Sequence, residues 1–163
     1  MINSGAGTAF NMNTNEVIAN VALRLLGKSL GQYQHLHPND HVNMSQSSND
    51  TFPTAMHVAI LFAVRDMIPT IDKLNKSLRK KAKEFSSYKK VGRTHLMDAL
   101  PVTLGSEFTS YATALTIARD GITSAKKELE KLALGGTAVG TGANTPKGYR
   151  TVSYTHLTLP TKA

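Results

Sequence analysis

Three polar segments contain the residues that could bind a small anion: GAGTAFNMN at 5–13, SQSSND at 45–50 and GRTHLMD at 92–98. Each offers neutral hydrogen-bond donors rather than a strong acid or base, and each falls at a predicted helix boundary. Such donors stabilise a carboxylate most where negative charge develops, as when a proton leaves the carbon beside it. The candidates for a carboxylate-binding shell are Thr8, Ser47, Ser48, Asn49, Thr94 and His95.

The segment from Ser45 to Asp50 also has a simpler interpretation. Ser, Asn and Asp cap helix N-termini, and Pro53, shortly after them, suits a first helical position. Capping is the more common use of such residues and would by itself explain this segment. The recurrence of donor-rich segments at three helix boundaries favours a binding site.

The histidines allow a metal site as an alternative. His35, His37 and His41 are closely spaced, as in some zinc sites. No cysteine or glutamate completes a ligand set, and Pro38 bends the backbone between the candidates, so we expect structural or surface histidines and no metal. We assign His57, among apolar neighbours, to packing or to the surface.

Composition indicates a soluble protein. The chain has 163 residues, of which 40% are hydrophobic and 18% charged, enough for one domain with a core. We expect no signal peptide and no membrane partner, because no apolar run approaches the roughly 20 residues that cross a bilayer. The absence of cysteine excludes disulfides and thiolate chemistry and agrees with a cytoplasmic location.

The formal net charge of +8 lies largely in three basic runs, at 79–83, 89–90 and 126–131. These runs fall on predicted helical faces, where solvated lysines are common. Only Tyr88 lies near them, whereas a nucleic-acid interface interleaves basic and aromatic residues, so we expect no nucleic-acid partner. A positive field would still attract a small dianion.

The apolar spacing predicts an all-α fold. The first helix should run from about Asn13, in a capping box with Glu16, to a stop at Gly27. A polar connection without strand alternation should follow. The face of this helix that we expect to be apolar and buried contains Val17, Ile18, Val21 and Leu25.

Two longer helices should follow. The second should run from about Pro53 to the high eighties with a kink at Pro69, and the third should begin near Pro101. Their apolar residues alternate in steps of four and three, which is typical of long helices packed at small angles. These seams are Ile60, Val64, Met67, Ile71, Leu74 and Leu78, then Leu104, Phe108, Tyr111, Leu115, Ala118, Ile122, Ala125, Leu129 and Leu132.

Two such helices cannot bury their seams against each other alone, so the pattern indicates a fragment of a larger helical bundle. A non-enzymatic helical scaffold would show the same seams. It would not need three donor-rich segments. A glycine-rich segment follows at 135–148, without the features of a P-loop or dinucleotide fingerprint.

Four segments resemble the aspartase/fumarase superfamily, and together the resemblance covers 4–150. They are NMNTNEVIAN, HPNDHVNMSQSSND, GRTHLMDALPVTLGSEF and LGGTAVGTGANTPKGY. The resemblance implies a central bundle of long helices in a homotetramer, with active sites where three subunits meet. It also implies reversible elimination from a C4 dicarboxylate substrate to give fumarate, without an organic cofactor.

Residue by residue, the resemblance assigns roles to several side chains. It implies that the substrate carboxylates are bound by Thr8, Ser47, Ser48, Asn49 and Thr94. His95 would bind the substrate or orient the reacting water or amine, which makes Thr94 and His95 the catalytic candidates. A second, shallower anion site would contain His37, Asn39 and Asp40.

One departure from the family pattern and one change of composition lead to further expectations. The family's catalytic base is a serine in a GSS-x-MP-x-K-x-N loop, a motif that this sequence does not contain. We therefore expect residues 1–150 to be a partial lyase chain that is inactive alone. The threonine-rich residues 151–163 could form a terminal strand, but we expect a foreign tail outside the fold.

The sequence features that indicate the substrate are divided between aspartate and malate. GAGT, with Ala6 where fumarases tend to have serine, and GQYQHL resemble aspartases. SSND, with Ser48 where aspartases usually have threonine, GRTHLMDA and LALGGTAVGTG resemble fumarases. The aspartase-like segments near the N-terminus include residues of the substrate site itself. The sequence therefore slightly favours aspartate ammonia-lyase over the alternative, fumarate hydratase.

Overall fold

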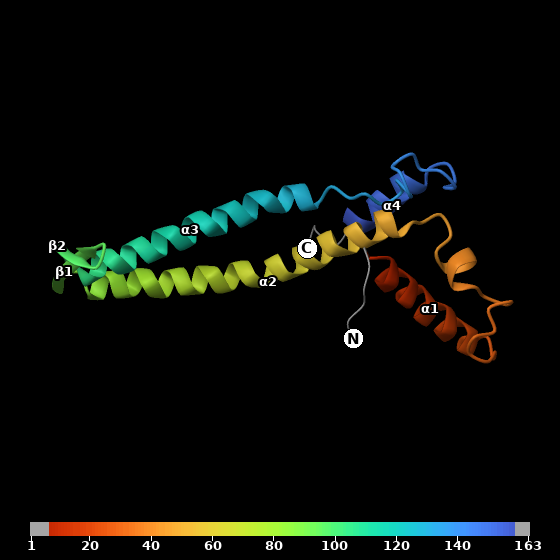
Figure 1. Cartoon of the computed structure of the whole chain (residues 1–163), viewed down its shortest axis with the longest axis horizontal. Coiled ribbons are helices and arrows are strands. Elements are labelled where there is room, and N and C mark those ends of the chain that lie inside the picture. The colour runs from red at the N-terminus through yellow and green to blue at the C-terminus, as the bar shows by residue number, and fades with distance from the viewer. Residues whose placement is uncertain (1–6, 159–163) are drawn as a thin grey trace. The chain divides into compact units, whose positions relative to one another are not determined.

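The computed structural model describes residues 7–158, with side chains as far as Tyr154. Its elements, in chain order, are α1 (Thr8–Leu25), a π-helix η1 (Pro38–Val42), α2 (Ser48–Glu84), β1 (Lys89–Thr94), β2 (Met97–Thr103), α3 (Leu104–Leu129) and α4 (Tyr149–Thr158) (Figure 1). The predicted helical fold is therefore confirmed, with one short hairpin added to it.

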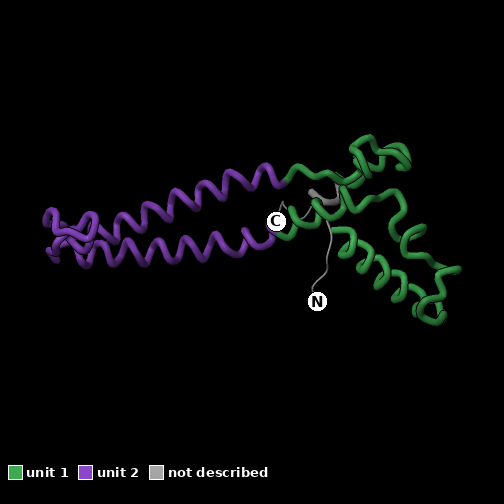
Figure 2. The backbone as a smooth tube through the Cα atoms, viewed as in Figure 1, with its two compact units in different colours: residues 1–59, 130–163 green, residues 60–129 purple. Residues whose placement is uncertain are grey.

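The chain divides into two compact units (Figure 2). Unit 1 contains residues 1–59 and 130–163, and unit 2 contains residues 60–129. Ala6, one of the positions that suggested an aspartase, and residues 159–163 of the expected tail lie outside the described residues. The described part of that tail is helical rather than a strand, and its Tyr154 hydroxyl accepts a hydrogen bond from the Leu132 N–H at 2.9 Å.

In unit 1, α1 begins at Thr8, so the capping box predicted at Asn13 and Glu16 is wrong. Gly7 starts the helix instead, with φ 92°, and a Cβ at this position would collide with the Phe52 ring. The predicted stop is confirmed. Gly27, with φ 69°, donates to the Arg24 carbonyl at 3.0 Å, and the next N–H bonds to the Leu23 carbonyl, which is a Schellman ending.

The buried face of α1 also differs from the prediction. Asn15, Ala19 and Leu23 are its buried residues. The apolar residues that were expected to be buried are exposed in this chain: Val17, Ile18, Val21 and Leu25. Periodicity identified an apolar face, but the hydrogen bonds between α1 and the polar connection after it involve asparagines of the helix, Asn15 with Asn43 and Asn20 with Tyr33.

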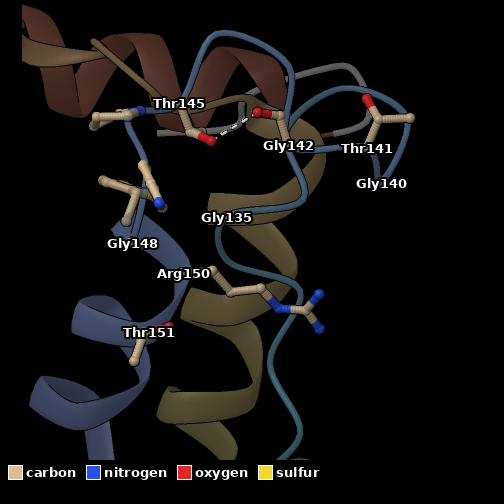
Figure 3. A pocket seen from close by; sticks show the side chains of 11 residues that line it. Gly135, Gly140, Thr141, Gly142, Thr145, Gly148, Arg150 and Thr151 are labelled. Atoms are coloured by element: carbon tan, nitrogen blue, oxygen red, sulfur yellow. Dashed lines mark hydrogen bonds between the residues drawn. The ribbon is translucent and has the colours of Figure 1, made fainter.

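The glycine-rich segment of unit 1 forms a series of turns, as its composition suggests. Gly135, Gly140, Gly142 and Gly148 all have positive φ, which favours glycine. With the start of α4, the segment encloses a cavity of about 280 Å³ (Figure 3). The Thr145 hydroxyl donates to the Gly142 carbonyl at 2.6 Å and closes one of these turns.

Unit 2 contains the remainder of α2, the hairpin and α3. Within it, only Val64 and Ala112 of the apolar side chains are buried, and much of the predicted seams is exposed, including Ile60, Leu74 and Tyr111. Aromatic contact joins the helix ends, with the Phe85 and Phe108 rings 5.4 Å apart. The seams are exposed because, within unit 2, each of the two helices packs against only one other helix.

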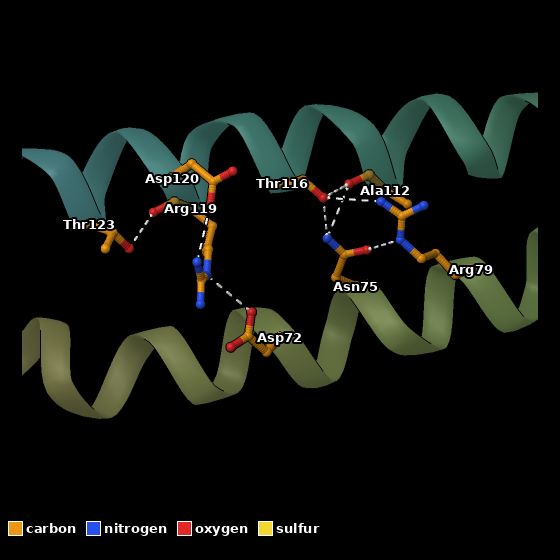
Figure 4. A network of polar contacts seen from close by, with 8 residues as sticks. All are labelled: Asp72, Asn75, Arg79, Ala112, Thr116, Arg119, Asp120 and Thr123. Atoms are coloured by element: carbon orange, nitrogen blue, oxygen red, sulfur yellow. Dashed lines mark hydrogen bonds and ion pairs between the residues drawn. The ribbon is translucent and has the colours of Figure 1, made fainter.

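Polar side chains connect α2 and α3 between residues 72–79 of one helix and 112–119 of the other (Figure 4). Asn75 donates to the Thr116 hydroxyl at 2.7 Å and to the Ala112 carbonyl at 3.2 Å, and it accepts from Arg79 Nε at 3.0 Å. These bonds fix the register of one helix against the other.

A second polar group on the same helices surrounds Arg119 (Figure 4). Its Nη1 donates to Asp120 at 3.0 Å, and its Nε lies 3.3 Å from Asp72 Oδ1. The hydrogen bond that Arg119 donates to Asp120 and the negative charge of Asp72 raise the pKa of Arg119. This guanidinium therefore stays charged beside its two carboxylates.

The GRTHLMD segment, predicted as a polar junction, forms an antiparallel β-hairpin instead. Val91 pairs with Pro101 and Thr94 with Met97, so the turn consists of His95 and Leu96 alone. Strand pairing also delays the third helix, which begins at Leu104 rather than near Pro101. Thr103 caps it, its hydroxyl accepting from the Ser106 N–H at 3.0 Å.

The second helix begins at Ser48 rather than Pro53 and continues through Pro69 to Glu84. It is long and apolar enough to cross a membrane by length and composition, so the expectation that no segment approaches that size is wrong. This criterion is weak evidence for one helix, because core helices of soluble proteins also meet it.

Candidate functional site

The start of α2 contains a capping box. Ser47 precedes the helix, and its hydroxyl accepts from the Asn49 N–H at 3.1 Å. In return, Asp50 Oδ1 accepts from the Ser47 N–H at 3.0 Å. The capping interpretation of this segment is thus confirmed for Ser47 and Asp50.

Asparagines from two other elements surround this helix start. Asn11 of α1 donates from Nδ2 to the Ser48 hydroxyl at 2.8 Å and to Asn43 Oδ1 at 3.1 Å. Asn15, one turn further along α1 and 4% exposed, donates to the same Asn43 oxygen at 3.0 Å. Sequence analysis missed these residues as a group, although their i, i+4 spacing places them on one face of a helix.

The glycine-rich segment is attached to the same helix start. Asp50 is 1% exposed, and its Oδ2 accepts from the N–H groups of Gly135 at 3.2 Å and Thr137 at 2.7 Å. Asn49 Nδ2 donates to the Ala138 carbonyl at 2.9 Å. These bonds join residues that are 85 to 89 positions apart in the chain.

A cavity of about 330 Å³ lies beside this junction. It is lined by neutral polar and small side chains: Asn39, Asn43, Ser45, Gln46, Ser47, Thr137, Ala138, Ala143 and Asn144. None of these groups is a strong acid or base at neutral pH. The cavity therefore suits hydrogen bonding to a small polar ligand, rather than proton transfer by its own walls.

The histidines near this cavity have partners within their own turn. His37 Nδ1 accepts from the N–H groups of Asn39 and Asp40, both at 3.2 Å, and so caps η1. His41 Nδ1 accepts from the His37 N–H at 2.9 Å. Each neutral ring consequently keeps Nε2–H as its free donor. In the described part of the chain, no group of three His, Cys, Asp or Glu side chains is placed to hold a metal ion.

The other candidates are distributed as follows. Thr8 is exposed in the first turn of α1, and His57 is half-buried, with Nδ1 3.2 Å from the Lys131 carbonyl. Unit 1 therefore brings together Ser47, Ser48 and Asn49 around the helix start. Thr94 and His95 belong to unit 2, where both are exposed at the tip of the hairpin.

The hairpin turn has unusual backbone geometry. His95 has φ 51° and Leu96 has φ 61°, so both central residues of a two-residue turn have positive φ, as a type I′ turn requires. Asn and Gly are the usual residues there, and a branched leucine is disfavoured. The steric cost of this turn therefore falls mainly on Leu96.

A family model described as lyase matches residues 1–163. The chain belongs to this lyase family.

Individual relatives are more specific. A fumarate hydratase class II from Chlamydia muridarum is 53% identical over 90% of this chain, and a mitochondrial fumarate hydratase from Rattus norvegicus is 52% identical over 90%. The crystal structure of a fumarate lyase:delta crystallin from Brucella melitensis, bound to cobalt, matches 97% of the chain with 42% identity and a TM-score of 0.85. The chain covers 32%, 29% and 34% of these proteins, respectively.

These comparisons bear on two expectations. The resemblance to the superfamily is confirmed, but the preference for aspartate ammonia-lyase is not supported, because both curated relatives are named fumarate hydratases. One of these relatives is named as mitochondrial, so a cytoplasmic location stays a prediction.

Proposed function

We propose that this chain supplies substrate-binding segments of a fumarate hydratase, which converts L-malate reversibly into fumarate and water. The 53% identity to a class II fumarate hydratase supports this over the ammonia-lyase. Since the chain spans about a third of that relative's length, the activity is proposed for a longer protein that includes it. We expect the 163-residue chain alone to be inactive.

The observation that carries the proposal is the direction of the hydrogen bonds at Ser47 and Ser48. Each hydroxyl oxygen already accepts an N–H, from the Asn49 backbone and from Asn11 Nδ2, respectively. Each hydroxyl proton is therefore left to donate. Two preset donors at adjacent positions of one helix start, of which Ser47 lines the 330 Å³ cavity, suit a substrate carboxylate.

The choice of malate over aspartate rests on the identity to the fumarate hydratase, because the amide and hydroxyl oxygens that line the cavity could accept from an ammonium group as readily as from a hydroxyl.

In the proposed reaction, a base removes a proton from C3 of malate, the electrons of that C–H bond form the C2=C3 double bond of fumarate, and the C2 hydroxyl takes up a proton and leaves as water. The carboxylate beside C3 gains negative charge as the proton leaves. The substrate carboxylates would be bound by Thr8, Ser47, Ser48, Asn49 and Thr94. His95 would orient the departing water. His37, Asn39 and Asp40 would form the second anion site.

The proposed assembly is a homotetramer, in which the exposed seams of α2 and α3 pack against helices of other segments or subunits. The base that takes the C3 proton would come from outside the candidate residues named above. No organic cofactor is part of the proposal.

The test is to assay the longer protein for fumarate absorbance with L-malate and with L-aspartate. We expect turnover of malate and none of aspartate; the reverse would overturn the hydratase assignment. Replacing Thr94 and His95 together by alanine should abolish turnover and leave the oligomeric mass, measured by light scattering, unchanged. Loss of assembly with normal turnover would instead favour a scaffold role for this hairpin.

A further inference from the structure

We infer that Asp50 is a positioning residue that connects the glycine-rich segment to the substrate-binding start of α2. This inference rests on the proposed function for its kinetic part. Its structural part stands on the geometry of unit 1 alone.

The Asp50 carboxylate is buried and accepts three backbone N–H groups. A carboxylate that is 1% exposed must have partners, because burying an unpaired charge is costly. Here Oδ1 serves the capping box at Ser47, and Oδ2 binds the N–H groups of Gly135 and Thr137. One side chain thus holds two segments that are remote in sequence.

The glycine-rich segment that Asp50 binds forms part of the wall of the 330 Å³ cavity. Thr137 has φ 58° and is 8% exposed, so its backbone is held in a conformation that a threonine rarely adopts. Thr137 and Ala138 line the same cavity as Ser47, and Asn49 bonds to the Ala138 carbonyl. Asp50 consequently sets the distance between two walls of the proposed substrate cavity.

The substitution Asp50→Asn separates the positioning role of Asp50 from simple capping. The amide of Asp50→Asn has one oxygen and one NH₂ group, so it cannot accept from Ser47 on one side and from two loop N–H groups on the other. If its oxygen keeps the cap, its NH₂ faces the Gly135 and Thr137 donors. The variant is nearly isosteric, and Asn is also tolerated at helix starts.

The structural test is amide hydrogen exchange on the longer protein. In the wild type, Gly135 and Thr137 should exchange more slowly than Val139, which is exposed in the same segment. In Asp50→Asn, their exchange should rise by about tenfold or more, as expected when buried donors lose their acceptor. Asp66→Asn, an exposed carboxylate on the same helix, is the matched control and should leave both rates unchanged.

The kinetic test separates positioning from stability. In Asp50→Asn, KM for malate should rise about three- to tenfold, more than kcat falls, because substrate binding loses its aligned wall. Asp50→Ala should show a larger rise if it folds, and Asp66→Asn none.

Two results would overturn the inference: wild-type Gly135 and Thr137 amides that exchange as fast as Val139, or a faster exchange in Asp50→Asn with unchanged KM. A wild-type protein that does not act on malate would refute the proposed function instead, and the exchange rates would still decide the structural part.

Discussion

Asn11 Nδ2 donates to the Ser48 hydroxyl at 2.8 Å, across 37 positions of sequence. The bond joins the first turn of α1 to the first residue of α2. It also leaves the Ser48 hydroxyl proton to act as a donor. Asn11, which need not touch the ligand, thus orients the hydroxyl of Ser48, which is proposed to bind it.

Replacing Asn11 by alanine should lower the free energy of unfolding by about 1–3 kcal/mol, because it removes two donated bonds and one accepted from Thr51. Asn13→Ala is the matched control, since Asn13 is exposed on the same helix, and its effect should stay within about 0.5 kcal/mol. Thermal unfolding of both variants measures the difference. Equal stabilities would show that the asparagine cluster contributes nothing.

Asn75→Ala should destabilise the paired helices of unit 2 by about 1–2 kcal/mol. It leaves Thr116 and Arg79 without their shared partner, and the higher helix propensity of alanine offsets only part of that loss. Amide exchange along α3 reports the change. The control is Lys76→Ala, because Lys76 is the next residue and its side chain is exposed; this variant should leave amide exchange along α3 almost unchanged. A change in exchange as large as that in Asn75→Ala would contradict the prediction.

Leu96→Gly should stabilise the hairpin by about 1 kcal/mol, because glycine removes the steric cost of φ 61° at a side chain that is 97% exposed. The same substitution at Leu100, exposed in β2, should have the opposite sign and cost about 0.5–1 kcal/mol. Exchange of the amides paired across the hairpin distinguishes the two. A loss of stability in Leu96→Gly would show that the turn is not strained.

Several local features followed from the sequence. Long helices were predictable because side chains three and four positions apart share a face, whatever the rest of the chain does. The stop at Gly27 was predictable because glycine adopts positive φ without steric cost. The sequence offered a helix cap for the segment that contains Ser47 but favoured a binding site there, and the structure shows the cap. The start of α1 was predicted too late because Gly7 has no side chain that could signal a cap.

The tertiary structure alone decided which polar residues act together. The sequence marked Ser47, Ser48 and Asn49, yet gave no sign that Asp50 would bind Gly135 and Thr137 or that Asn11 would bind Ser48. The hairpin at His95 was missed because its two-residue turn contains His95 and Leu96 instead of the Asn or Gly that usually signals such a turn. Helix and cap signals act over a few residues and can be recognised in sequence, whereas a hydrogen bond across 85 positions exists only once the path of the chain brings donor and acceptor together.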